Sequence, residues 1–206
     1  MTEEHFVAMY NHCSEAARPG GLSVTPEQWW RALLTMAYMC GWRLGELLSL
    51  RWDDVDLETG TAITRAANNK GKRDETVRLH PIVIEHLEPL RSFDSLVFSW
   101  DRHRRALYFD LERIQTAAGI HLPCPDAGTE RHGDCTPACH LYSFHDERRA
   151  FATNNEGRVS PETLQKLMRH RSYATTQGYI QMARKLNPAV DDLHVPAIPR
   201  VAGKIG

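Results

Sequence analysis

Apolar residues recur at helical spacing through the first quarter of the chain. The stretch 3–17 carries its large apolar side chains on one helical face, namely Phe6, Met9, Tyr10 and Cys13. A second stretch begins at Thr25 and Pro26, residue types favoured at a helix N-cap and in the first turn, and runs to Gly41. A third helix is expected over 43–51. The pattern therefore predicts three helices before the first strand.

The pattern changes in the middle of the chain. Stretches 61–66 and 75–80 are predicted strands joined by a basic, glycine-containing connection, and 53–60 before them is a predicted turn. Helical spacing returns over the stretches 81–90, 101–118, 145–156, 161–169 and 173–185. Between them, 121–140 has no periodicity, which is typical of an insert. We therefore expect a mostly helical chain with one small antiparallel sheet.

Composition narrows the class of protein. With 206 residues, 42% of them hydrophobic, the chain is long enough for a core of ordinary size. Its net charge of -1 and pI near 6.8 lack the basic excess of a dedicated nucleic-acid binder. The basic residues nevertheless gather locally, at Arg65, Lys70, Lys72, Arg73 and Arg78, at Arg102, Arg104 and Arg105, and at Arg148, Arg149, Arg169, Arg171, Arg184 and Lys185. One basic face is compatible with this distribution.

The chain contains no apolar run of membrane-spanning length, and its first residues lack the pattern of a secretory signal. We therefore expect a cytoplasmic protein. Five cysteines, an odd number, argue against a disulfide framework in a reducing compartment.

Three segments far apart in the sequence carry groups suited to binding one phosphate. In the first, Glu46 lies one helical turn after Arg43 and is able to fix its rotamer. In the second, the i,i+3 spacing puts His145 and Arg148 on one face, as a donor array for phosphate oxygens. In the third, His170 precedes a predicted helix that carries Tyr179. Taken alone, each motif is more typical of a structural role.

Taken together, the order Arg-x-x-Glu, His-x-x-Arg, and His followed nine residues later by Tyr resembles the tyrosine recombinase, or phage integrase, family. Flanking residues agree, including Leu-Arg-Trp-Asp-Asp-Val-Asp at 50–56 and Thr-Thr-Gln-x-Tyr-Ile before and at 179–180. The match spans about residues 26–183. The resemblance implies an α+β catalytic domain, mostly helical, with a small antiparallel three-stranded sheet.

The resemblance also implies the chemistry. Tyr179 attacks the scissile DNA phosphate and forms a 3′-phosphotyrosyl link, while Arg43 and Arg148 clamp the non-bridging oxygens. His170 donates a hydrogen bond to the phosphate, and His145 assists proton transfer at the tyrosine. The family's mechanism requires no cofactor or metal for catalysis.

The family further uses a lysine from a β-hairpin turn to protonate the leaving 5′-oxygen. Counting back from the strand that contains Val77 points to Lys70, and Lys72 is the alternative because hairpin lengths vary. Glu46 is expected to hold the Arg43 side chain in place without contacting the phosphate itself. Further DNA contacts are expected from the remaining basic residues near these motifs, Lys72, Arg73, Arg149, Arg169 and Arg171. Arg169 stands where the family often has glycine, which leaves the local backbone geometry open.

The insert is not part of the general family pattern. It offers Cys124, His132, Cys135 and Cys139 as a candidate tetrahedral set for structural zinc, with His140 as a substitute ligand. The Cys135–Cys139 spacing matches no standard knuckle, and a metal-free loop with reduced thiols is the alternative.

We expect a catalytic domain over 1–187, including the insert at 121–140, followed by a tail over 188–206 that docks on a neighbouring protomer or is disordered. The family's N-terminal core-binding domain is expected to be absent. Expected partners are double-stranded DNA and three further copies, in a homotetramer on synapsed sites, with a monomer in isolation. Alternative functions are a catalytically silent DNA-binding module of the same fold and strand relaxation of the type IB topoisomerase kind.

Overall fold

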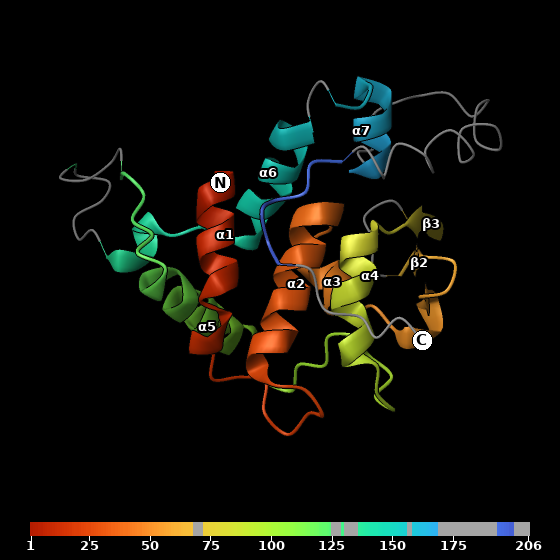
Figure 1. Cartoon of the computed structure of the whole chain (residues 1–206), viewed down its shortest axis with the longest axis horizontal. Helices are drawn as coiled ribbons and strands as arrows, with labels where there is room; N and C mark the ends of the chain where they lie inside the picture. The colour runs from red at the N-terminus through yellow and green to blue at the C-terminus, as the bar shows by residue number, and fades with distance from the viewer. Residues whose placement is uncertain (68–71, 125–128, 130–135, 156–157, 169–192, 200–206) are drawn as a thin grey trace.

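The computed structural model describes residues 1–67, 72–124, 129, 136–155, 158–168 and 193–199 (Figure 1). The helices are α1 Glu3–Asn11, α2 Pro26–Cys40, α3 Leu44–Leu47, α4 Pro81–Leu87, α5 Arg104–Ala117, α6 Phe144–Asn155 and α7 Pro161–Leu167. The strands are β1 Val55–Asp56, β2 Thr61–Thr64 and β3 Glu75–Arg78, and the 3-10 turns are η1 Cys13–Glu15, η2 Trp52–Asp54, η3 Glu88–Leu90 and η4 Pro137–His140. This mostly helical architecture with a small sheet confirms the predicted fold class.

Helix α2 forms the centre of the fold. Thr25 caps its first turn in a capping box with Gln28, and Pro26 occupies the first helical position, where no N–H is needed. The helix is buried on nearly all sides because α4 and α6 pack against it (Figure 1). It ends at Gly41, whose φ of 60° is the left-handed conformation that glycine adopts without strain. The apolar pattern predicted this helix and both of its ends.

The sheet has the order β1-β2-β3, and both pairings are antiparallel. Ala62 of β2 pairs with Val77 of β3 and is fully buried. At Gly60 the backbone comes so close to α4 that an added Cβ would lie 2.8 Å from Ile84 Cδ1. The sheet therefore packs on α4, on the side of the molecule away from α5 (Figure 1).

Several predicted boundaries differ from the structure by a few residues, and two predictions were wrong in a way that affects the path of the chain. The segment 53–60, predicted as a turn, contains η2 and β1. The helix predicted over 43–51 ends at Leu47, because the next residues leave the helix to pair with 95–97: Val97 N donates to Leu50 O at 2.9 Å, and Trp52 N donates to Ser95 O at 3.1 Å. The chain thus turns from α3 into the sheet within a few residues.

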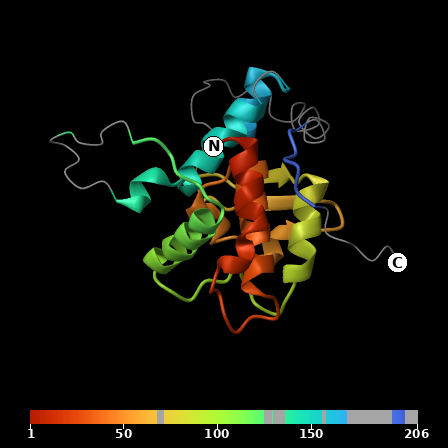
Figure 2. The same ribbon diagram turned by 60° about the vertical axis from the view of Figure 1, so that its left-hand side comes forward.

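Both described ends of the chain pack on the helical body. Helix α1 contacts α2 and α5 and crosses the front of the molecule in Figure 2. From the predicted tail, residues 193–199 lie on the same chain: the backbone N–H of His194 donates to Asn155 Oδ1 at 2.8 Å, and that of Ala197 donates to Glu3 Oε1 at 3.1 Å. Leu193 is buried there. Within the described residues, no helix is long and apolar enough to cross a membrane.

Candidate active site

Arg43 lies at the junction of α2 and α3, where Gly41 reverses the chain. Its backbone N–H donates to Glu46 Oε2 at 2.9 Å, and its guanidinium Nη1 donates to Glu46 Oε1 at 3.3 Å. The Glu46 side chain is 4% exposed, whereas that of Arg43 is 35% exposed. A buried carboxylate therefore holds both ends of Arg43 and leaves part of the guanidinium at the surface, as the i,i+3 spacing predicted.

Arg148 connects three segments of the chain. It lies on α6 and is 4% exposed. Its Nη1 donates to the carbonyl of Gly41, two residues before Arg43, and its Nη2 donates to the carbonyl of Met168, which caps α7 two residues before His170. The guanidinium is planar and presents its N–H groups in a fixed fork, so one side chain satisfies both carbonyls. The three motifs that are separate in sequence therefore approach one another at Arg148.

The other predicted residues of α6 differ in exposure. His145 and Arg149 are exposed, and Arg149 Nη1 lies 3.5 Å from Asp146 Oδ1. His145 and Arg148 are one turn apart, yet His145 lies at the surface while Arg148 lies in the interior. The i,i+3 spacing places them on neighbouring positions of the helix but does not give them the same environment.

Glu147, between these residues, points into the protein interior. It is 1% exposed, and among the described residues its Oε2 has no hydrogen-bond partner. Burial raises the pKa of this carboxyl well above its ordinary value, and the neighbouring charge of Asp146 adds to the increase. Its three- and four-residue spacing from Phe144 and Phe151, both buried, is the sequence signal for this position.

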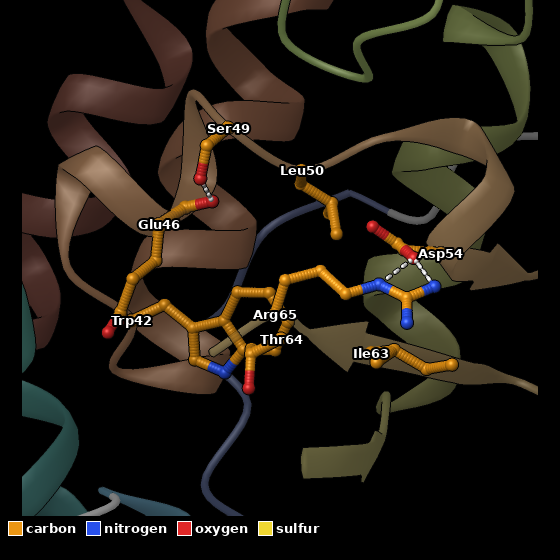
Figure 3. A pocket seen from close by; sticks show the side chains of 8 residues that line it. All are labelled: Trp42, Glu46, Ser49, Leu50, Asp54, Ile63, Thr64 and Arg65. Carbon is orange, nitrogen blue, oxygen red and sulfur yellow. Dashed lines mark hydrogen bonds and ion pairs between the residues drawn. The ribbon is translucent and has the colours of Figure 1, made fainter. Parts of the chain in front are cut away.

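A hollow separates α3 from the end of β2 (Figure 3). Its lining includes Trp42, Glu46 and Leu50 from the segment around α3, and Thr64 and Arg65 from the end of β2. Its inner space is about 10 Å³, which is at the lower limit for a single water molecule. The hollow is therefore a packing junction between the Arg43 segment and the sheet, and it is too small for a ligand.

The remaining predicted catalytic residues lie outside the described residues. These are Lys70, His170 and Tyr179, and the same holds for the basic residues Arg169 and Arg171. Lys72 and Arg73 are described and exposed, at the start of the segment that enters β3. Lys72 has a φ of 52°, a left-handed conformation that is unusual for a residue with a Cβ. The described part of the site thus comprises Arg43, Glu46, His145 and Arg148.

The insert is closed at its base. Leu122 N donates to His140 O at 2.8 Å, and the ring of His140 stacks on that of His121 with centroids 4.2 Å apart. Next to this pair, the Gln115 side chain bonds to both the N–H and the carbonyl of Tyr142, at 2.6 Å and 2.9 Å. Beyond these residues the described parts of the insert project from the side of the molecule near α5 (Figure 2).

The predicted zinc ligands are described only in part. Cys124, Cys139 and His140 are described, whereas His132 and Cys135 lie outside the described residues. The Cys139 thiol lies 3.4 Å from the hydroxyl of Thr136. Within the residues that the structure places, no group of three or more His, Cys, Asp or Glu side chains is arranged to hold a metal ion. The geometry gives the zinc hypothesis no support.

Residues 1–185 match the sequence model of the phage integrase family. A tyrosine recombinase, XerA of Thermococcus kodakarensis, is 27% identical over 165 residues, which cover 74% of this chain and 50% of that protein. The chain spans about half the length of the curated relatives it matches.

Two solved structures share the fold. An integrase from mycobacterium phage Brujita superposes with a TM-score of 0.60 at 21% identity, over 87% of this chain and 56% of that one. A lambda integrase dimer bound to a core site gives a TM-score of 0.59 at 18% identity, over 84% of this chain and 57% of that one.

Proposed function

Because the chain belongs to the phage integrase family, we propose that it catalyses site-specific recombination by cutting and rejoining DNA through a 3′-phosphotyrosyl intermediate. The observation that carries this proposal is the position of Arg148, whose bonds to Gly41 and Met168 hold the Arg43 segment and the segment leading to His170 together. A phosphodiester is negatively charged and its leaving alkoxide is poor, so its cleavage needs charge neutralisation and a proton donor at one place. This convergence supports the first requirement, because it brings the charge of Arg148 next to the Arg43 segment.

The proposed cleavage step conserves charge and protons. The Tyr179 oxygen forms a bond to phosphorus as the bond from phosphorus to the 5′-oxygen breaks. The phenolic proton passes to His145, and Lys70 gives a proton to the departing 5′-oxygen. Rejoining is the reverse reaction, in which a 5′-hydroxyl attacks the phosphotyrosine, so the bond energy is retained for the new strand.

The two arginines would stabilise the five-coordinate phosphate. Arg43 has part of its guanidinium at the surface and is fixed by Glu46, so its N–H groups are available to a non-bridging oxygen in one geometry. Arg148 would contribute its permanent charge from the interior and keep the surrounding backbone in position. His170 would donate to the second oxygen.

A selection with nicked DNA tests the proposal. The protein is incubated with duplexes that carry a randomised central segment and a nick, so that the short 5′-hydroxyl fragment dissociates after cleavage and the covalent complex accumulates. We expect an SDS-resistant complex with the wild-type chain and none with Tyr179→Phe. A complex that persists in Tyr179→Phe would refute the assignment of the nucleophile.

Addition of EDTA to the same reaction tests whether metal takes part. The arginine pair is proposed to stabilise the phosphate, so we expect the complex to form at an unchanged rate. Loss of the complex in EDTA while the circular dichroism spectrum is retained would contradict the mechanism.

The proposed partner is double-stranded DNA, bound as a homotetramer on synapsed sites, with a monomer in isolation. The DNA-bound lambda integrase structure supports DNA as the partner, and Lys72, Arg73 and Arg149 are exposed cations that would contact the phosphate backbone. We expect the affinity for DNA to fall steeply as the salt concentration rises. Changing any one of these residues to alanine should lower the slope of log affinity against log salt concentration by the contribution of about one phosphate contact. An unchanged slope in all three variants would place the DNA elsewhere.

Structural zinc in the insert is a separate proposal, supported by the residue types Cys124, His132, Cys135 and Cys139. Native mass spectrometry of the purified chain measures bound zinc directly. One zinc ion per chain, lost in Cys139→Ser, is the expected result. A metal-free chain that is fully folded would refute it.

A further inference from the structure

Arg65 joins two carboxylates that come from different parts of the sheet region. It follows the last residue of β2, and its Nε donates to Asp54 Oδ1 at 2.6 Å (Figure 3). Its Nη1 donates to Asp74 Oδ2 at 3.0 Å, just before β3 begins. The other oxygen of Asp74 accepts the backbone N–H of Ala66 at 2.7 Å. These bonds tie the end of β2 to the start of β3.

The network is anchored in the protein interior at one end. The Asp54 side chain is 3% exposed and belongs to η2, whereas those of Arg65 and Asp74 are 44% and 52% exposed. Bonds to the two carboxylates raise the pKa of Arg65, and bonds from Ala66 N–H and Arg65 lower the pKa of Asp74. Both pKa shifts favour the charged forms of Arg65 and Asp74, so they strengthen the ion pair between these two residues.

The network also lies next to the candidate active site. Arg65 and Asp54 line the same hollow as Glu46, the residue that fixes Arg43 (Figure 3). The connection whose two ends the network fixes is the one that carries Lys70 and Lys72. A guanidinium suits this position because its fork reaches two carboxylates at once, which a lysine ammonium does less well.

We propose that Arg65 is a positioning residue that sets the place of the proton-donating lysine relative to Arg43. The inference rests on the proposed function. Lysine carries its charge on a long flexible stem, and a proton donor acts only within hydrogen-bond reach of the leaving oxygen. Asp54 holds Arg65, and Asp74 holds both Arg65 and Ala66, so the described residues on the two sides of the connection are tied together.

The test compares two DNA substrates that differ in one atom. The first is a duplex obtained in the nicked-DNA selection, and the second has sulfur in place of the bridging 5′-oxygen at the cleaved bond. A thiol has a pKa of about 8.5, far below that of an alcohol, so a thiolate departs without being protonated. A defect in proton donation therefore lowers cleavage of the oxygen substrate and spares the sulfur substrate.

We expect Arg65→Ala to lower the single-turnover cleavage rate of the oxygen substrate by roughly 100-fold, the scale of one misplaced proton donor, and to leave the rate on the sulfur substrate nearly unchanged. Arg65→Lys retains the charge without the fork and should fall between Arg65→Ala and the wild type on the oxygen substrate. Asp74→Asn removes only the exposed arm of the network and should show the same preference for sulfur, with its fold intact. Arg51→Ala is the matched control, because Arg51 is 49% exposed and has a weak 3.9 Å contact to Asp53.

Equal losses on both substrates in Arg65→Ala and Asp74→Asn would overturn the inference and leave the proposed function standing, and so would full activity of both variants. A wild-type chain that cleaves neither substrate would refute the proposed function and this inference with it.

Discussion

Glu147→Gln should make the protein more stable at neutral and alkaline pH. The carboxyl is 1% exposed on α6, and its Oε2 has no hydrogen-bond partner among the described residues. Ionising such a group in the interior removes its hydration without replacing it. Glutamine has nearly the same shape and stays neutral at every pH.

The sign follows from the raised pKa. Burial, assisted by the charge of Asp146 and opposed by the N-terminal amino group, raises the pKa of Glu147 in the folded protein above its value of about 4.3 in an unfolded chain. Above that pH the folded state holds a proton that the unfolded state has lost. The free energy of unfolding of the wild type therefore falls as pH rises, with a slope that corresponds to at most one proton per molecule. The decrease ends once the pH exceeds the pKa of the folded state.

The size of the effect follows from the burial. Leaving a buried polar group without its partner costs roughly 1–3 kcal/mol, and more when the group is charged. We expect a stabilisation of this order at about pH 8 that shrinks toward zero near pH 4, where glutamic acid is protonated in both states. In a chain of this length each kcal/mol raises the melting temperature by about 2–4 °C.

Urea unfolding followed by circular dichroism, at several values between about pH 4.5 and 8.5, measures the difference. Glu112→Gln is the control, because Glu112 lies on α5 with part of its side chain exposed to water. It should follow the wild type at every pH. Parallel curves for wild type and Glu147→Gln, or a variant that is less stable at alkaline pH, would show that the carboxyl is not held neutral in the interior.

Three further predictions concern stability and the site. Gly41→Ala should lower the free energy of unfolding by roughly 1–3 kcal/mol, because φ is +60° and the added Cβ would lie 2.7 Å from a ring carbon of Phe151; an unchanged melting temperature would contradict this. Asn155→Ala removes the acceptor of the His194 N–H and should speed hydrogen exchange at that amide roughly five-fold, with no change expected if residues 193–199 leave the body in solution. Lys72→Gly should retain stability or gain up to about 1 kcal/mol because φ is 52°, and should retain cleavage; loss of cleavage would make Lys72 the proton donor.

Local signals predicted most of the fold. Helix α2 follows from a cap, a proline and an apolar pattern that all act within a few residues of each other, so its start at Pro26 and its end at Gly41 were both predictable. The early end of α3 was not, because it depends on Leu50 pairing with Val97, a distant residue, through backbone atoms. Main-chain hydrogen bonds between remote segments leave little trace in side-chain patterns.

The candidate site likewise has a part that the sequence predicted and a part that it did not. The Arg43–Glu46 pair follows from helical spacing, and the structure contains it. Arg148 donates to two backbone carbonyls, a group that every residue possesses, so no sequence pattern predicted these bonds. The network of Arg65 with Asp54 and Asp74 escaped prediction for another reason, since its members are common surface residue types that only the sheet brings together.

The closed base of the insert determines how well the fold tolerates a change in loop length. Because Leu122 and His140 are hydrogen-bonded to each other, the chain leaves and re-enters the body at almost the same point. Lengthening a loop between ends that are already joined costs little free energy, since the entropic cost grows only slowly with loop length. Helices α5 and α6 should therefore keep their places when the segment between them is lengthened, and inserted sequence at this position should cost little stability.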